Sequence, residues 1–347
     1  MKTLLNQVAI FLLVGIWASS CTLTEKLEDK NFEADGWNAV KLNEAFGFLQ
    51  IESASAFQEV YLILSESHEE VSFYHGDLEG FTSQMTAYAS IDTDEEYLQV
   101  ANDLNGHPYL NFLYVDIDQT TREMSAERVV PSPTFARLVN KDGLLQIEHV
   151  LYKYTQHQII KVENPSSEQV KELIDWHGGA LPSYAVLHQE LDSRDHAQSL
   201  SRAVNDVCTN QYRIGGSNPW YRIRGQLEKF QSTNRGFYFE DWYVTTTHQR
   251  RRFQIWFGNN DADLEASYFN TFTIGNTGGT PQTVNVSKVQ PSAEYCFEKI
   301  IGCSAEEGTG SPCETDGFVW LGQTFNTGGT HKATQGATTK ICETDPN

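Results

Sequence analysis

The spacing of apolar residues changes character near the middle of the chain. Up to about residue 180, short strand-like apolar runs alternate with segments whose apolar residues recur at helical spacing. From about residue 207 onward, the chain shows strand-like segments separated by turn residues. This pattern predicts an α+β N-terminal domain followed by an all-β, sandwich-like C-terminal domain.

The first half carries the clearer signals for single elements. Strands are expected over 46–51, 108–117, 144–154 and 158–162, and helices over 94–104 and 134–139. A further helix is predicted to follow Ser53 or Ser55, both of which suit an N-cap. Ser166 precedes Gln169 by the spacing of a capping box and therefore marks the start of another helix.

The domain boundaries follow from a break at Gly178-Gly179 and from a polar stretch over 184–200 that is typical of a connecting helix. We expect the α+β domain over 37–180, a linker over 181–206 and the sandwich-like domain over 207–347. The strands of the second domain are expected over 220–230, 237–247, 252–257, 266–274, 282–287 and 317–325. A chain of 347 residues is long enough for two domains.

The N-terminus has the order of an export signal. Lys2 is followed by ten apolar residues over 8–17 and by small residues, so residues 1–20 are a predicted signal peptide and 21–36 a polar tether. Ala18-Ser19-Ser20-Cys21 resembles the lipobox of bacterial lipoproteins, which implies acylation of Cys21 and attachment to the outer membrane or cell surface. Ordinary cleavage at an A-x-A-like site, giving a secreted or periplasmic protein, is the alternative.

A second resemblance lies in the first half. The run Pro133-Thr-Phe-Ala-Arg-Leu-Val-Asn140-Lys-Asp-Gly143, followed by Gln146-Ile147 and Tyr152-Lys-Tyr154, is similar to a segment of uncharacterised exported bacterial lipoproteins. This resemblance covers a short part of the chain and also implies that the protein is exported. It carries no known chemistry, so it transfers no catalytic residue.

The formal charge of the chain is −21 and is unevenly distributed. Over 22–130, 22 Asp and Glu residues stand against 5 Lys and Arg residues. Such an acidic surface repels phosphate backbones, so we exclude nucleic acid as a partner. The same acidity argues against electrostatic attachment to anionic lipids, which leaves the N-terminal lipid as the expected link to a membrane.

Cysteine use fits an exported protein, because four of the six cysteines lie within the last 52 residues. We expect these four to form two disulfides: Cys296, Cys303, Cys313 and Cys342. Their spacing contains no C-x2-C pair, which disfavours zinc. If Cys21 carries lipid, one of the other five cysteines is left without a partner in the chain; if it does not, six cysteines allow three bridges.

Motifs for catalysis are absent from the sequence. The chain lacks both the G-x-S-x-G of serine hydrolases and the H-E-x-x-H of metalloproteases. Asn259-x-Asp261-x-Asp263-x-Glu265 offers alternating oxygen ligands but departs from an EF-hand, so a loose structural calcium site is an alternative to having no cofactor. A hydrolase built on two carboxylates has no sequence signature to test.

The most distinctive stretch is 211–257, which holds twelve aromatic residues and eight Lys and Arg residues against three acids. In the expected strand over 252–257, side chains alternate between the two faces, so Phe253, Ile255 and Phe257 lie on the core face. Trp256 and Arg252 then share the outward face and are the predicted binding residues, because exposed aromatics and arginines are enriched at recognition surfaces.

In an alternative interpretation, both faces of this strand are covered and the arginines of this stretch pair with acids of the preceding domain. The arginines concerned are Arg222, Arg224 and Arg250–Arg252. The chain is expected to be a surface-exposed or secreted lipoprotein that binds a glycan or a protein and is not an enzyme. The alternative function is an extracytoplasmic hydrolase with an unrecognised carboxylate site.

Overall fold

The computed structural model describes the chain between residues 35 and 344, with gaps. The described ranges are 35–65, 71, 78–91, 93–106, 110–117, 121–130, 132–190, 203–214, 220–234, 237–259, 261–272, 282–290, 295–306, 313–315, 318–320 and 325–344; for 203–207, 227–240 and 268–327 only backbone is described. The predicted signal peptide and lipidation site, Cys21, lie outside these residues. None of the described helices combines the length and apolar character that crossing a membrane requires.

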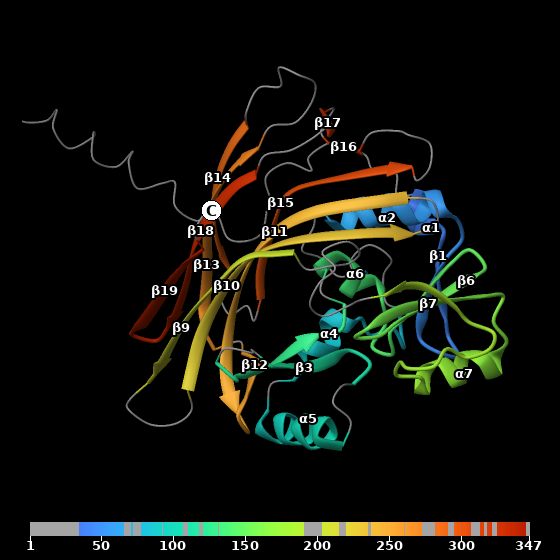
Figure 1. The fold of residues 1–347 in the computed structure, drawn as a ribbon, viewed down its shortest axis with the longest axis horizontal. Coiled ribbons are helices and arrows are strands. Elements are labelled where there is room, and N and C mark those ends of the chain that lie inside the picture. Colours follow the sequence, from blue (N-terminus) through green and yellow to red (C-terminus); the bar gives the residue numbers. More distant parts are fainter. Residues whose placement is uncertain are drawn as a thin grey trace, which may run out of the picture.

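The fold class agrees with the prediction, since helices and strands mix in the first half and the second half is rich in sheet (Figure 1). A six-stranded sheet organises the first half. In spatial order it contains β1 (Val40–Asn43), β2 (Phe48–Ile51), β5 (Leu144–Ile147), β6 (Val150–Tyr154), β7 (Gln158–Glu163) and β8 (Val186–Glu190). Its neighbouring strands are antiparallel except for β2 and β5, which pair in parallel.

Helices pack on both faces of this sheet. On one face, α2 (Ala54–Ser65) and α6 (Pro133–Leu138), preceded by the short α1 (Asp35–Asn38), cover the larger apolar core. On the other face, α7 (Ser167–Asp175) buries Val170 and Leu173 against a second core. The predicted capping box is confirmed, because the Ser166 side chain accepts the Gln169 N–H and the Gln169 side chain accepts the Ser166 N–H.

A nine-stranded sheet spans both halves of the chain (Figure 1). The first half supplies β3 (Leu113–Ile117) and β4 (Met124–Arg128), with α4 (Gln84–Ala89) and α5 (Asp94–Gly106) nearby. The second half supplies β9 (Ala203–Arg213), β10 (Trp220–Asn234), β11 (Phe237–Arg252), β12 (Ile255–Gly258), β15 (Tyr295–Glu306), β16 (Cys313–Thr315) and β17 (Phe318–Trp320). The two sets meet where β4 pairs in parallel with β12.

A four-stranded sheet packs on the larger one and makes the second half sandwich-like. Its strands are β14 (Gln282–Gln290), β13 (Asp263–Phe272), β18 (Phe325–Gln335) and β19 (Thr338–Thr344). Ile223, Leu264 and Ala333 form the apolar core between the sheets. Gly225 on β10 lets the buried His331 ring of β18 approach, since a Cβ at Gly225 would fall 2.1 Å from that ring.

The two halves meet through a polar, buried interface. Tyr61 of α2 donates a hydrogen bond to the buried Asp241 of β11, and the hydroxyls of Thr134 and Tyr243 lie 2.7 Å apart. Such contacts, together with the shared sheet, hold the halves in one orientation. The predicted domain boundaries at 37–180 and 207–347 remain predictions, but β3 and β4 show that the first half also builds the sheet of the second.

The predicted helix over 184–200 is wrong for its described part. Val186–Glu190 forms the edge strand β8, paired with β7. Leu187 packs against the apolar core beneath α7, and this tertiary contact outweighs the helical preference of a polar stretch. Residues 191–200 lie outside the described residues.

The predicted disulfide pairing is wrong for Cys342, which pairs with Cys208 and not within the tail. β19 lies beside β9, where the Asn210 side chain donates to the Ile341 carbonyl at 2.8 Å, and this brings the two cysteine Cα atoms to 5.6 Å. The side chains of Cys296, Cys303 and Cys313 lie outside the described part of the structure, so their pairing remains a prediction.

A buried histidine makes the stability of the sandwich sensitive to acid. His248 has no exposed surface, and its Nε2 lies 2.7 Å from the Tyr212 hydroxyl. Burial lowers the pKa of His248 from 6.5 to about 4, although Asp261 acts in the opposite direction. The unfolded chain therefore takes up a proton more readily between these two pH values, and stability falls as the pH falls.

The loss is expected to approach about 3 kcal/mol, most of it between about pH 6.5 and pH 4 and almost none of it above about pH 7.5. Urea unfolding of the wild type and of His248→Gln across this range measures it. The glutamine variant should show a flatter dependence on pH. Parallel curves for the two proteins would reject the assignment to His248.

Candidate functional site

The predicted binding pair does not form a surface. Trp256 is fully buried (0 % exposed), whereas Phe253, predicted to lie in the core, is 52 % exposed. The expected strand over 252–257 is interrupted, because Phe253 and Gln254 have φ values of 48° and 68° and form a tight turn between β11 and β12. Arg252 lies half-buried at the end of β11, and because Trp256 is buried, the two residues do not share an exposed face.

Both faces of β12 are covered, as the alternative interpretation required. On one face, the Phe257 ring lies 4.9 Å from the Tyr97 ring of α5. On the other, the Arg222 and Arg251 guanidinium groups lie 4.5 Å and 5.8 Å from the centre of the Trp256 ring.

The pairing of arginines with acids of the first half is confirmed for two residues. Arg222 forms an ion pair with Glu123 at 3.1 Å, and Arg224 forms one with Glu127. Burial, and then the nearby Arg224, lower the pKa of Arg222 to about 10, which leaves this group charged at neutral pH. At these positions, the aromatic and basic stretch over 211–257 therefore contributes to the packing of the fold, and these two arginines are not available to a ligand.

A concave site lies on the six-stranded sheet, on the face that α7 covers. Side chains alternate along β2 and β5, so Phe48 and Gln50 share this face with Leu144 and Gln146. Just beyond the ends of these strands, Glu52 and Glu148 line the same site. Phe48 and Leu144 are buried beneath α7, and the four polar side chains lie beyond them. The resulting cleft has a volume of about 670 Å³ and is bordered by Asn164, Pro165 and Ser167 at the start of α7.

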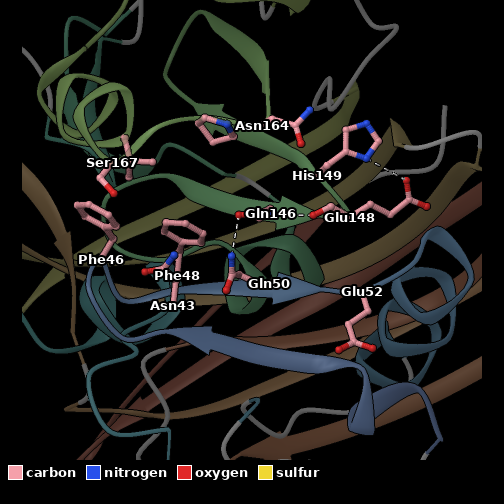
Figure 2. A pocket seen from close by; sticks show the side chains of 12 residues that line it. Asn43, Phe46, Phe48, Gln50, Glu52, Gln146, Glu148, His149, Asn164 and Ser167 are labelled. Atoms are coloured by element: carbon pink, nitrogen blue, oxygen red, sulfur yellow. Dashed lines mark hydrogen bonds and ion pairs between the residues drawn. The ribbon is translucent and has the colours of Figure 1, made fainter.

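The two ends of this cleft differ in chemistry (Figure 2). At one end, the stacked rings of Phe46 and Phe48 lie 6.4 Å apart, near Ser167. At the other end lie Glu52, Glu148 and His149. An apolar ring surface at one end and carboxylates at the other suit a ligand that has both apolar C–H faces and polar groups.

A chain of amides joins the ends. Gln50 Nε2 donates to Gln146 Oε1 at 2.9 Å, and Gln146 Nε2 donates to the Glu148 carbonyl oxygen at 2.8 Å (Figure 2). The parallel register places Gln50 directly beside Gln146. Because each amide is held by the next, the polar floor of the cleft is ordered before any ligand arrives.

The carboxylates at the far end have protein partners. Glu148 Oε1 accepts the Ala54 N–H at 3.2 Å at the start of α2, and its Oε2 lies 4.0 Å from His149 Nδ1. Glu52 forms an exposed ion pair with Lys41. These contacts position both carboxylates along the cleft.

In the candidate calcium loop over 259–265, two of the oxygen-bearing side chains already have protein partners. Asn259 is buried and its side chain accepts the Asp261 N–H at 3.3 Å, while Glu265 forms an ion pair with Lys332 at 3.1 Å. Across the described residues, no group of three or more His, Cys, Asp or Glu side chains is placed to hold a metal ion.

Comparison with known proteins adds little to this site. No protein-family model and no curated protein matches the chain. Among solved structures, the chain is similar to a DUF4848 family protein from Bacteroides thetaiotaomicron, at 12 % identity and a TM-score of 0.26, over 88 % of this chain and 98 % of that one. A likeness this weak carries no functional argument, so the function rests on the chain's own residues.

Proposed function

We propose that this protein is an exported, lipid-anchored binding module that holds a hydroxyl-rich ligand, a glycan, in the cleft on the six-stranded sheet. The observation that carries the proposal is the amide pair Gln50–Gln146 in a cleft of about 670 Å³, between aromatic rings and carboxylates. Amides and carboxylates exchange hydrogen bonds with hydroxyl groups, and aromatic rings pack against the apolar faces of sugars.

The position of the cleft favours a glycan over an extended peptide. An extended peptide usually adds to the free edge of a sheet, where its backbone pairs with unpaired backbone groups. Here β2 and β5 lie inside the sheet, with β1 and β6 as their outer neighbours. The floor of the cleft, on β2 and β5, therefore offers side chains to a ligand.

Hydrolysis is the second candidate, because Glu52 and Glu148 line the same cleft. The contacts of these carboxylates favour binding, since one is held by a helix N-terminus and the other by Lys41. Release of reducing sugar from a bound oligosaccharide, and its loss in Glu148→Gln, would favour the hydrolase instead.

The proposal that the protein is exported rests on the order of residues 1–21 and on cysteine chemistry. The Cys208–Cys342 pair supports it, because disulfides persist mainly in oxidising compartments. A glycan-binding protein held at the cell surface by Cys21 would meet its ligand outside the cell.

An oligosaccharide array followed by calorimetry tests the proposed function. We expect the wild type to bind at least one member, and Gln50→Ala and Gln146→Ala to weaken that binding about tenfold or more, because each leaves the part-buried amide of the other without this partner. Gln158→Ala is the matched control, since Gln158 belongs to β7 and bonds to Gly179, away from the cleft. The proposal fails if no member binds, or if all three variants bind as the wild type does.

A further inference from the structure

The amide chain in the cleft has a fixed direction. Its last acceptor is the backbone carbonyl of Glu148, which cannot donate, so Gln146 must present its NH₂ group there. The Gln146 oxygen then faces Gln50, and Gln50 must present its own NH₂ group in turn. The Gln50 side-chain oxygen is therefore turned away from Gln146 and can act as an acceptor (Figure 2).

The carboxylate end adds more acceptors. Glu148 uses one oxygen for the Ala54 N–H, and an ionised carboxylate can accept about four hydrogen bonds in all. Glu52 has an exposed partner, Lys41, and exposed ion pairs are weak enough to be exchanged for a ligand. A bound ligand must therefore supply hydrogen-bond donors at this end.

The described positive groups near this end of the cleft each lie beside a carboxylate. Lys41 is paired with Glu52, and His149 lies beside Glu148. The N-terminus of α7 is closed by its own capping box and carries Glu168 in its first turn. Among the described residues at this end, an anionic ligand would thus meet two carboxylates against one lysine, and this negative balance would repel it.

We infer that the cleft selects uncharged glycans over acidic ones, and that Glu148 is the specificity-determining residue. This inference rests on the proposed function and names the ligand class of the same site. Glu148 is the decisive carboxylate because α2 fixes its position at the end of the amide chain. Glu52 reinforces the same exclusion.

Calorimetry with two matched oligosaccharides tests the inference. The probes are oligomers of glucose and of glucuronic acid of equal length and linkage, in the linkage that the array favours. The wild type should bind the neutral oligomer at least about tenfold more tightly, because like charges held close together are strongly disfavoured. Glu148→Gln keeps the acceptor for the Ala54 N–H and removes the charge. Together with Glu52→Gln, it should raise the ratio of acidic-oligomer affinity to neutral-oligomer affinity about tenfold, because the amides still accept hydrogen bonds but no longer carry charge.

Glu163→Gln is the control, because Glu163 is exposed on β7 outside the cleft. Unchanged selectivity in the double variant would overturn the inference. Equal binding of both oligomers by the wild type would also overturn the inference. If that binding is still weakened by Gln50→Ala, the proposed glycan-binding function remains supported and only the selectivity claim fails. Binding of neither oligomer would overturn both claims together.

Discussion

Replacing Trp256 with alanine is expected to lower the free energy of unfolding by about 3–5 kcal/mol, the usual cost of removing a large buried aromatic side chain. Trp256 is fully buried, and the Arg222 and Arg251 guanidinium groups lie 4.5 Å and 5.8 Å from its ring centre, so the substitution opens a cavity and removes two cation–π contacts. Thermal and urea unfolding followed by circular dichroism measure the effect.

Phe253→Ala is the matched control for Trp256→Ala. Phe253 lies three residues away in the exposed turn, and its removal should change stability by less than about 0.5 kcal/mol. The opposite result, with Trp256→Ala harmless and Phe253→Ala costly, would restore the strand over 252–257 that the sequence pattern predicts.

Removing the disulfide is the second change with a large expected effect. The Cys208–Cys342 bridge closes a separation of 134 residues, and in the chain-entropy model a loop of that length is worth about 5 kcal/mol. The double variant Cys208→Ser/Cys342→Ser should unfold at correspondingly lower urea concentration than the oxidised wild type. Urea unfolding with and without reductant measures the difference.

The reductant provides the control for this comparison. It should destabilise the wild type toward the level of the double variant, and it should affect the double variant much less. Mass spectrometry of non-reduced peptides should recover Cys208 linked to Cys342. A peptide that links Cys342 to Cys296, Cys303 or Cys313 would restore the pairing expected from their closeness in sequence.

Local signals in the sequence predicted local structure well. Ser166 and Gln169 are enough to start α7, because the capping contacts lie within one helical turn. The same holds for α2, which starts just after Ser53, whose side chain accepts the Ala56 N–H at 3.1 Å. The sheet-rich second half was also predictable, since its turn residues recur between strand-like runs.

The failure at β12 has a definite physical cause. Tight two-residue turns usually carry glycine or asparagine, and Phe253-Gln254 carries neither, so the turn is invisible in the pattern. Both faces of the following strand are covered, by α5 and by Arg222, and period two alone cannot reveal a second covering layer. Trp256 therefore looked like a surface residue.

The cleft escaped the sequence analysis because its floor joins two distant segments. Gln50 and Gln146 are 96 residues apart and meet only through the parallel pairing of β2 and β5. In each short strand, a polar residue beside apolar neighbours is typical of an ordinary solvent face. The available signal was that Gln and then Glu stand two residues apart at the end of each strand: Gln50 and Glu52 at β2, and Gln146 and Glu148 at β5.

Hydroxyl-radical footprinting with and without a bound oligosaccharide tests the cleft most directly. Phe46 and His149 line opposite ends of the cleft, whereas the exposed Phe253 lies in the β11–β12 turn of the other sheet. If the glycan occupies the cleft, oxidation of Phe46 and His149 should slow several-fold while that of Phe253 stays unchanged. Protection of Phe253 with no change at Phe46 and His149 would contradict the account.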